Sequence, residues 1–210
     1  MDVDLHALYK DVPNWVGTPA SPIDSFTDFS KGPQRLDEYA VPQDGRCGTL
    51  SPADHWGLVG SQTSLYNDTI TKPAYRKGET GMIGNVDLYM TQNVATHTVG
   101  AVAGTVLIDG TINTSTVTWD DVKDTGTQTI HVDGLTSATA TINKGDVFTI
   151  EGVYAVNPVT KARLSFLKQF TVTADATASS NEVDLVISPP MIWTGAQKAV
   201  DGFSDVQVFS

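Results

Sequence analysis

Four histidines are the side chains of this sequence best suited to acid–base or metal chemistry near neutral pH. They are His6, His55, His97 and His131, and each is isolated from the others, without a metal-binding spacing such as H-E-x-x-H. A lone histidine is usually a structural or solvent-facing residue. We therefore predict no metal ion, no cofactor and no catalytic base at these positions.

The acidic segment WDDVKDTG contains Asp120, Asp121 and Asp124, which together suggest a calcium loop. A calcium loop of the hand type needs acids at alternate positions, a central glycine and a terminal bidentate glutamate. The segment lacks this pattern. We interpret it instead as a solvated connection within a β-hairpin.

Two glycine-containing segments resemble binding motifs. Gly81 and Gly84 in GMIG match the G-x-x-G clamp of KH domains, but that clamp lies between two helices, whereas a strand pattern follows here. The tripeptide Lys144-Gly145-Asp146 could bind a surface receptor, although Asn-Lys-Gly before an alternating apolar run is an ordinary turn. We predict a turn at each. Nucleophile elbows, phosphate loops and dinucleotide fingerprints do not occur, so the sequence favours a protein that is not an enzyme.

The composition indicates one or two turn-rich β or α+β domains. The chain has 210 residues, of which 40% are hydrophobic and only 18% charged, with 18 glycines and 10 prolines. Its formal charge of -11 disfavours generic electrostatic attraction to nucleic acid. Cys47 is the single cysteine, and neither a signal pattern nor an apolar run of membrane-spanning length occurs. We expect a soluble protein that is made in the cytoplasm.

Helical spacing is confined to residues 1–95. It predicts the end of a helix before Pro13 and a helix over Ser25–Tyr39 that is interrupted at Gly32-Pro33. Ser51-Pro52 would begin a short helix, with serine as the cap and proline in the first position. A further helix would end at Gly78. Between and after the helices we predict a short buried strand in RCGTL and a strand in NVDLYMTQNV.

From about residue 96 the pattern is that of strands. Val183, Leu185 and Ile187 alternate with Glu182 and Asp184, which predicts a strand with one buried face. Phe148 with Ile150, and Phe170 with Val172, have the same period of two. We predict seven strands in a small antiparallel barrel or sandwich, in the segments TVLID, STVTW, QTIHV, ATATI, DVFTI, KQFTVTA and EVDLVIS.

Four segments in order resemble major capsid (coat) proteins of tailed bacteriophages. They are DLHALYKDVPNWVGTP, VPQDGR, AYRKGETGMIGNVDLYMTQNVATHTVG and KGDVFTIEGVYAVNPVTKARLSFLKQFTVTADAT. The resemblance is to the branch of short-tailed Salmonella-type phages whose coat proteins carry an inserted β-barrel. It implies an α+β chain with a partial Hong Kong 97-type capsid fold and an inserted antiparallel β-barrel domain.

The same resemblance implies a division into three parts. Residues 1–95 would be pieces of the peripheral and axial capsid domains, and residues 96–192 the inserted barrel, which in such coats aids subunit folding and contacts between capsomers. Residues 193–210 would begin the return into the axial domain. Because family members are much longer, we expect a partial chain.

A coat subunit of this kind self-assembles into the icosahedral shell that encloses the phage genome. Its implied partners are other copies of itself in hexamers and pentamers, with a scaffolding protein and a portal as further candidates, and without specific nucleic-acid or membrane binding. The implied location is the virion capsid, after synthesis in the host bacterial cytoplasm.

Charged side chains at loops and helix ends are our candidates for assembly contacts, together with the loop over residues 11–19. These side chains are Lys72, Arg76, Lys77, Asp120, Asp121, Lys123 and Asp124. The alternative is a β-barrel binding module of a phage particle that recognises a carbohydrate or receptor. In that case Trp119, Trp193 and Tyr154 would form a stacking platform.

Overall fold

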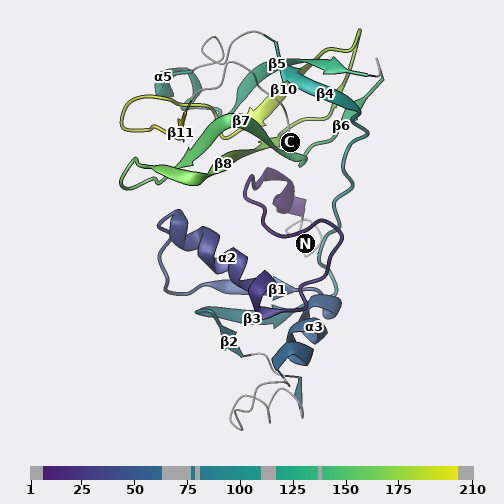
Figure 1. Ribbon diagram of the computed structural model, residues 1–210, viewed down its shortest axis with the longest axis vertical. Coiled ribbons are helices and arrows are strands. Elements are labelled where there is room, and N and C mark those ends of the chain that lie inside the picture. Colours follow the sequence, from purple (N-terminus) through teal and green to yellow (C-terminus); the bar gives the residue numbers. More distant parts are fainter. Residues whose placement is uncertain (1–6, 63–76, 79–80, 110–116, 137–138, 203–210) are drawn as a thin grey trace. The chain divides into compact units, whose positions relative to one another are not determined.

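The computed structural model describes residues 7–62, 77–78, 81–109, 117–136 and 139–202, and these divide between two compact units (Figure 1). The first unit comprises Val16–Ala95, and the second, which we call the β-rich unit, comprises Ala7–Trp15 together with the chain from Thr96 onward. The chain therefore passes from one unit to the other at residues 15–16 and again at residues 95–96.

In the described part of the first unit, the helices α2 and α3 pack against a three-stranded sheet. Its elements are α2 (Phe26–Glu38), β1 (Cys47–Leu50), α3 (Pro52–Gln62), β2 (Met82–Ile83) and β3 (Val86–Met90). The strand order is β1-β3-β2, with β1 parallel to β3 and β2 antiparallel to it. Phe29, Leu50, Leu58 and Val86 form the core that joins both helices to the sheet.

Both helices of the first unit begin at a serine cap. The Asp28 amide donates to Ser25 Oγ (3.2 Å), and the Asp54 amide donates to Ser51 Oγ (3.2 Å). Each serine hydroxyl in turn donates to the carboxylate of the same aspartate, at 2.7 Å and 2.6 Å. These contacts satisfy amides that lack a partner in the first helical turn. The predicted start of a helix at Ser51-Pro52 is therefore confirmed.

The predicted interruption at Gly32-Pro33 is wrong, because α2 continues through Pro33. Proline in a helix interior removes one backbone hydrogen bond and costs about 3 kcal/mol. Two features of α2 offset this cost. Phe29 is buried in the core, and the ends are held by the Ser25 cap and by the Tyr39 amide, which donates to the Arg35 carbonyl (3.2 Å). Tertiary packing here overrides local propensity.

The strands predicted in RCGTL and NVDLYMTQNV are confirmed as β1 and β3, although of β1 only Leu50 is buried. Gly84 and Asn85 both have positive φ (57° and 62°) and connect β2 to β3 in a two-residue turn. Such turns match the twist of a hairpin. The GMIG segment is therefore a strand and a turn, as predicted, and a strand follows it where a KH clamp needs a helix.

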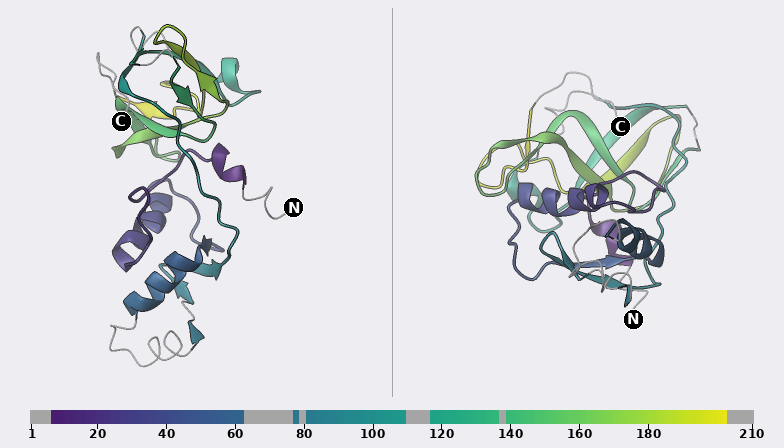
Figure 2. Two further views of the ribbon diagram at one scale, coloured as in Figure 1. Left: turned by 90° about the vertical axis from the view of Figure 1, so that its right-hand side faces the viewer. Right: turned by 60° about the horizontal axis from the view of Figure 1, so that its bottom comes forward.

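The β-rich unit is built on a six-stranded antiparallel sheet that curls around its core (Figures 1 and 2). In the order β11-β7-β8-β10-β5-β4, its strands are Val200–Asp201, Val147–Val156, Arg163–Val172, Val183–Ser188, Gln128–Leu135 and Gly104–Ile108. A separate pair is formed by β6 (Thr141–Ile142) and β9 (Ala176–Thr177). The predicted α+β class is therefore confirmed as a mixed helix and sheet fold with a curled antiparallel sheet.

The period-two pattern places the predicted side chains in the core of the β-rich unit. Val183, Leu185 and Ile187 on β10 are 7%, 1% and 0% exposed, and the intervening Asp184 is exposed. Ile150, Phe170 and Val172 are also buried, and Phe148 packs against the same cluster. Alternation is therefore sufficient to identify the buried face of these strands.

One of the seven predicted strands is wrong in the part that the structure describes. Residues 117–118 of STVTW are not in a strand, and Trp119 begins the helical turn α5 (Trp119–Val122). Asp121 Oδ2 accepts from the amide (3.0 Å) and the hydroxyl (2.6 Å) of Thr118, which forms a capping box. This local capping overrides the strand propensity of Val and Thr. The turn lies on the connection between the antiparallel neighbours β4 and β5, as the predicted hairpin connection requires.

The helix predicted before Pro13 is present as the short 3-10 helix η1 (Ala7–Asp11). Among the helices that the structure describes, none combines the length and the hydropathy needed to cross a membrane.

Candidate functional site

Asp146 is the centre of a polar network in the β-rich unit. Its side chain is only 10% exposed, and its Oδ2 accepts from the amides of Gly100 (3.0 Å) and Asn143 (2.8 Å). Its Oδ1 lies 2.7 Å from His97 Nε2, and His97 Nδ1 lies 3.1 Å from the Tyr9 hydroxyl. Because an ionised carboxylate can only accept, His97 Nε2 donates to Asp146. We call Tyr9, His97 and Asp146 the hub.

The turn that precedes β7 positions Asp146. The Asp146 amide donates to the Asn143 carbonyl (3.0 Å), and the Gly145 amide donates to the Val172 carbonyl on β8 (2.8 Å). The turn predicted at Lys144-Gly145-Asp146 is therefore confirmed. It directs the Asp146 carboxylate toward the segment that follows residue 96, where His97 and Gly100 meet it.

The N-terminal segment of the β-rich unit is fastened to strand β8. The Gln169 side chain forms two hydrogen bonds with the Trp15 backbone, donating to its carbonyl (2.8 Å) and accepting from its amide (3.0 Å). The Thr171 hydroxyl donates to the Lys10 carbonyl (3.2 Å), and Thr171 is fully buried. Side chains 169 and 171 lie on one face of β8 because they are two residues apart.

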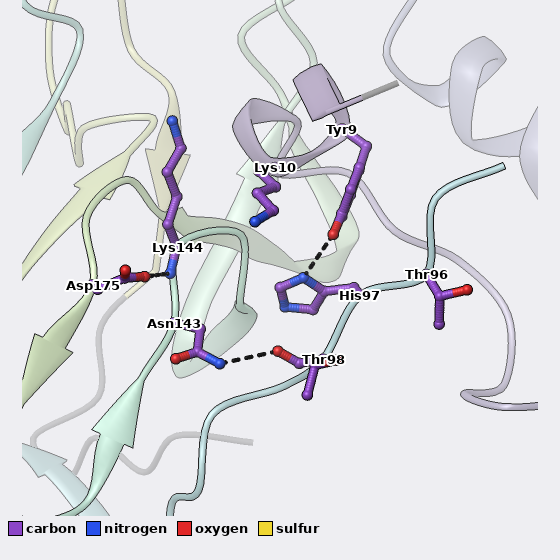
Figure 3. Close-up of a pocket in the computed structure, with 8 residues that line it drawn as sticks. All are labelled: Tyr9, Lys10, Thr96, His97, Thr98, Asn143, Lys144 and Asp175. Atoms are coloured by element: carbon purple, nitrogen blue, oxygen red, sulfur yellow. Dashed lines mark hydrogen bonds between the residues drawn. The ribbon is translucent and has the colours of Figure 1, made fainter. Parts of the chain in front are cut away.

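A polar pocket of about 280 Å³ adjoins the hub (Figure 3). Lys10, Lys144 and His97 contribute basic groups to it, and Asp175 contributes a carboxylate that accepts from the Lys144 amide (2.7 Å). Asn143 also lines the pocket and donates to the Thr98 carbonyl (3.1 Å). The remaining lining residues are Tyr9, Thr96 and Thr98. Both signs of charge line the pocket, so its electrostatics do not select an anion or a cation.

A second histidine lies among carboxylates on the outer face of the sheet. His131 on β5 has its Nδ1 2.6 Å from Asp184 Oδ1, and its Nε2 lies 3.6 Å from Glu182 and 4.0 Å from Asp109. The hydrogen bond to Asp184 raises the pKa of His131, burial opposes this shift, and the charges of Asp184, Glu182 and Asp109 raise the pKa further. The acidic patch therefore favours the protonated form of this histidine.

Four of the predicted assembly residues come together at α5. Asp121 is engaged by Thr118, whose hydroxyl and amide hold the pKa of Asp121 below its usual value. Asp120 is 85% exposed and lies 3.5 Å from Lys123, and Asp124 is exposed directly after them. The structure therefore brings these charges onto one surface turn. Their contact with a neighbouring subunit stays a prediction.

The other predicted assembly residues are only partly described. Lys72 and Arg76 lie outside the described residues, whereas Lys77 is exposed. In the loop over residues 11–19, Asp11 forms an ion pair with Lys144 (2.8 Å) and Trp15 is held by Gln169 as described above. This part of the loop is therefore engaged within its own chain.

The three aromatic residues of the alternative binding platform have different environments. Trp193 packs against the core of the β-rich unit. The Arg163 guanidinium lies 3.5 Å from the centroid of the Tyr154 ring and covers one of its faces. Trp119 is 47% exposed at the start of α5. Two of the three rings are thus already engaged by the protein, which argues against a carbohydrate platform.

The hub fastens chain segments and does not have the geometry of a catalytic centre. The order hydroxyl, imidazole, carboxylate is that of a nucleophilic triad, which also needs amides directed at a reacting oxygen. Here the nearby amides of Gly100 and Asn143 both donate to Asp146. Within the described part of the chain, no group of three or more His, Cys, Asp or Glu side chains is arranged to hold a metal ion.

Sequence patterns could not identify the hub, because its members are 88 and 49 residues apart. His97 is one of four isolated histidines in the sequence, which does not indicate a partner for it. The one local signal was Asp146 itself, an acid at the end of a turn that precedes a strand.

The chain matches the family described as "P22 coat protein - gene protein 5" over residues 10–204, which include most of both units. A search of curated proteins found no match.

Proposed function

The chain belongs to the P22 coat protein family, and from this premise we propose that its β-rich unit is the inserted β-barrel domain of a coat protein. As a member of this family, the chain is a major capsid subunit of a phage shell, located in the virion capsid, and it assembles with copies of itself. The observation that carries this conclusion is the continuous match over residues 10–204. In this proposal the first unit is a piece of the peripheral and axial capsid domains, and the chain after residue 192 returns toward the axial domain.

Two separate cores support the assignment of an inserted domain. Among the described residues, the buried cluster of the β-rich unit contains 17 members, whereas that of the first unit contains four. A unit with its own core has the property expected of a domain that can be inserted into another fold. We infer that the curled sheet of the β-rich unit corresponds to the inserted β-barrel that the family resemblance implies.

The size of the larger core also supports a role in subunit folding. Burial of an aliphatic or aromatic side chain contributes about 1.5–3 kcal/mol, so the β-rich unit carries most of the hydrophobic stabilisation among the described residues. A first unit with a small core would gain order from being attached to a stable neighbour in the same chain. The inserted domain would in this way aid folding of the whole subunit.

Charged loops of the β-rich unit are our candidates for contacts between capsomers. A chain with a formal charge of -11 repels its copies at long range, so subunit contacts need local pairing of opposite charges. Asp120 and Asp124 are exposed on the α5 turn, and Lys77 is an exposed basic residue of the first unit. Hexamers and pentamers, a scaffolding protein and a portal are further predicted partners, and synthesis in the host bacterial cytoplasm is the predicted origin.

Charge reversal at α5 tests this proposal. The double variant Asp120→Lys/Asp124→Lys is compared with the wild type by sedimentation velocity and electron microscopy of purified protein. We expect the wild type to form shell-like particles and the variant to form fewer, while both keep the same melting temperature. A control is Asp44→Lys, at an exposed aspartate in the turn before β1. Wild-type protein that stays monomeric at every concentration would contradict self-assembly, and equal particle yields of both α5 forms would remove α5 from the contact.

A further inference from the structure

Within the described residues, two segments carry the chain between the units, and both are fastened to the β-rich unit where they leave it. The first ends at Trp15, whose backbone amide and carbonyl are bound by Gln169 (3.0 Å and 2.8 Å). The second begins at Thr96 and is bound by Asp146, which accepts from the Gly100 amide (3.0 Å) and from His97 (2.7 Å). Each crossing is therefore held within a few residues of the boundary.

The Tyr9–His97 hydrogen bond links these two crossing segments directly. Tyr9 lies on η1, in the segment that leads to the first crossing, and His97 is the second residue after the chain returns. The two rings also meet edge to face, with centroids 5.7 Å apart. Figure 3 shows Tyr9 and His97 directed toward one another from these two segments.

Burial makes Asp146 a firm anchor for this link. Its side chain is 10% exposed and is bound by two backbone amides and one imidazole. Charge-assisted hydrogen bonds of this kind are stronger than neutral ones. The returning segment is also pressed against β6, since a side chain at Gly100 would collide with the Thr141 carbonyl oxygen. The chain at the second crossing is therefore held on the β-rich unit by Asp146 and by close contact with β6.

We propose that Tyr9, His97 and Asp146 form a lock that fastens both crossings at one place on the β-rich unit and so limits the motion of the two units relative to one another. With the lock formed, the second crossing is held from His97 onward. When the contacts of His97 are broken, the chain is next held at Thr98, whose carbonyl accepts from Asn143 (3.1 Å), and each released residue adds roughly 3.3–3.6 Å of reach. The lock does not depend on the assignment of the protein as a capsid subunit.

Distance measurements between the units test the lock. Cys47 is the only cysteine and is exposed in the first unit, so it provides one natural labelling site. Val159, which is 75% exposed between β7 and β8, is replaced by cysteine to provide the second site. Double electron–electron resonance between spin labels at the two sites measures the distribution of distances between them. We expect a broader distribution in His97→Ala and Tyr9→Phe than in the labelled parent protein.

His131→Ala is the matched control. It also removes a histidine bound to an aspartate, at 2.6 Å compared with 2.7 Å. This pair joins β5 to β10, and neither residue is next to a crossing. We expect this variant to keep the parental distribution. Hydrogen exchange provides an independent measurement, and the amides of Gly100 and Asn143 should exchange roughly tenfold faster or more in His97→Ala.

The proposal is overturned if Tyr9→Phe and His97→Ala both keep the parental distribution, or if His131→Ala broadens it equally. If His97→Ala fails to fold, Tyr9→Phe decides the question, because it removes one hydroxyl and keeps the ring contact with His97. A folded Tyr9→Phe variant with an unchanged distribution would then reject the lock.

Discussion

His131 and Asp184 lie directly opposite one another on β5 and β10, with His131 Nδ1 2.6 Å from Asp184 Oδ1. The hydrogen bond to Asp184 is the main reason that the pKa of His131 is raised, and Glu182 and Asp109 add to the effect by their charges. This pair is an ion pair only while the imidazole is protonated. Its contribution to stability therefore depends on pH.

A raised histidine pKa predicts that Asp184→Asn destabilises the protein more at pH 6 than at pH 9. Below the unfolded pKa, about 6.5, the stabilisation by the protonated pair is fully present, and it is lost as pH rises through the folded pKa. The effect should be small because His131 is 41% exposed and its charges are screened by solvent. Thermal unfolding at the two pH values measures the change in stability, and an NMR titration of the ring should show a lower pKa in the variant. Asp124→Asn serves as a control, and an unchanged His131 titration in Asp184→Asn would contradict the assignment of the cause.

The contacts of Arg46 lead to a second prediction, which concerns the stability of the first unit. The residue is 8% exposed, and its guanidinium donates to the carbonyls of Pro42 (2.9 Å) and Val41 (2.7 Å) and to Asp37 (2.8 Å). Arg46→Met leaves these carbonyls without their donor, which should lower the free energy of unfolding by about 1–3 kcal/mol. Asp37→Asn should cost less, because the Asp37 side chain is 51% exposed and can bind water. Urea unfolding measures both, and a larger loss in Asp37→Asn would show that the ion pair outweighs the carbonyl contacts.

The packing of the core of the β-rich unit leads to a third prediction, which concerns the loss of stability when Phe170 is truncated. Phe170 is fully buried beside Phe148, with ring centroids 5.8 Å apart. Phe170→Ala should lower the free energy of unfolding by about 3–5 kcal/mol, because it removes the ring and leaves a cavity. Val159→Ala, at a 75% exposed position, should change it by less than about 0.5 kcal/mol. Denaturant unfolding compares the two variants, and similar losses in both would mean that the β-rich unit is not packed around Phe170.

The elements that a periodic pattern defines could be predicted, and those that depend on distant contacts could not. The alternation of Val183, Leu185 and Ile187 identified a buried strand face because each strand residue faces the side opposite its neighbours. The continuation of α2 through Pro33 depends on the burial of Phe29 in a core made by residues from other elements. Thr118 is a residue type that favours strands, but here it caps α5 by hydrogen bonding to Asp121. The hub was inaccessible to sequence patterns because Tyr9, His97 and Asp146 meet only in the folded chain.

Two glycines at and near the β4–β5 pair allow the steric cost of an added side chain to be separated from the cost of backbone strain. Gly134 on β5 has a φ of 76°, and a side chain there would collide with the Thr105 carbonyl oxygen on β4. Gly126 has a similar φ of 65° but no atom within 4 Å of the position that a Cβ would take. Gly126→Ala should therefore cost only the strain of a left-handed backbone, about 1–2 kcal/mol. Gly134→Ala should cost several kcal/mol more, because the backbones of β4 and β5 must also separate. Thermal unfolding of the two variants measures the difference, and equal losses would mean that the two strands are not in close contact at Gly134.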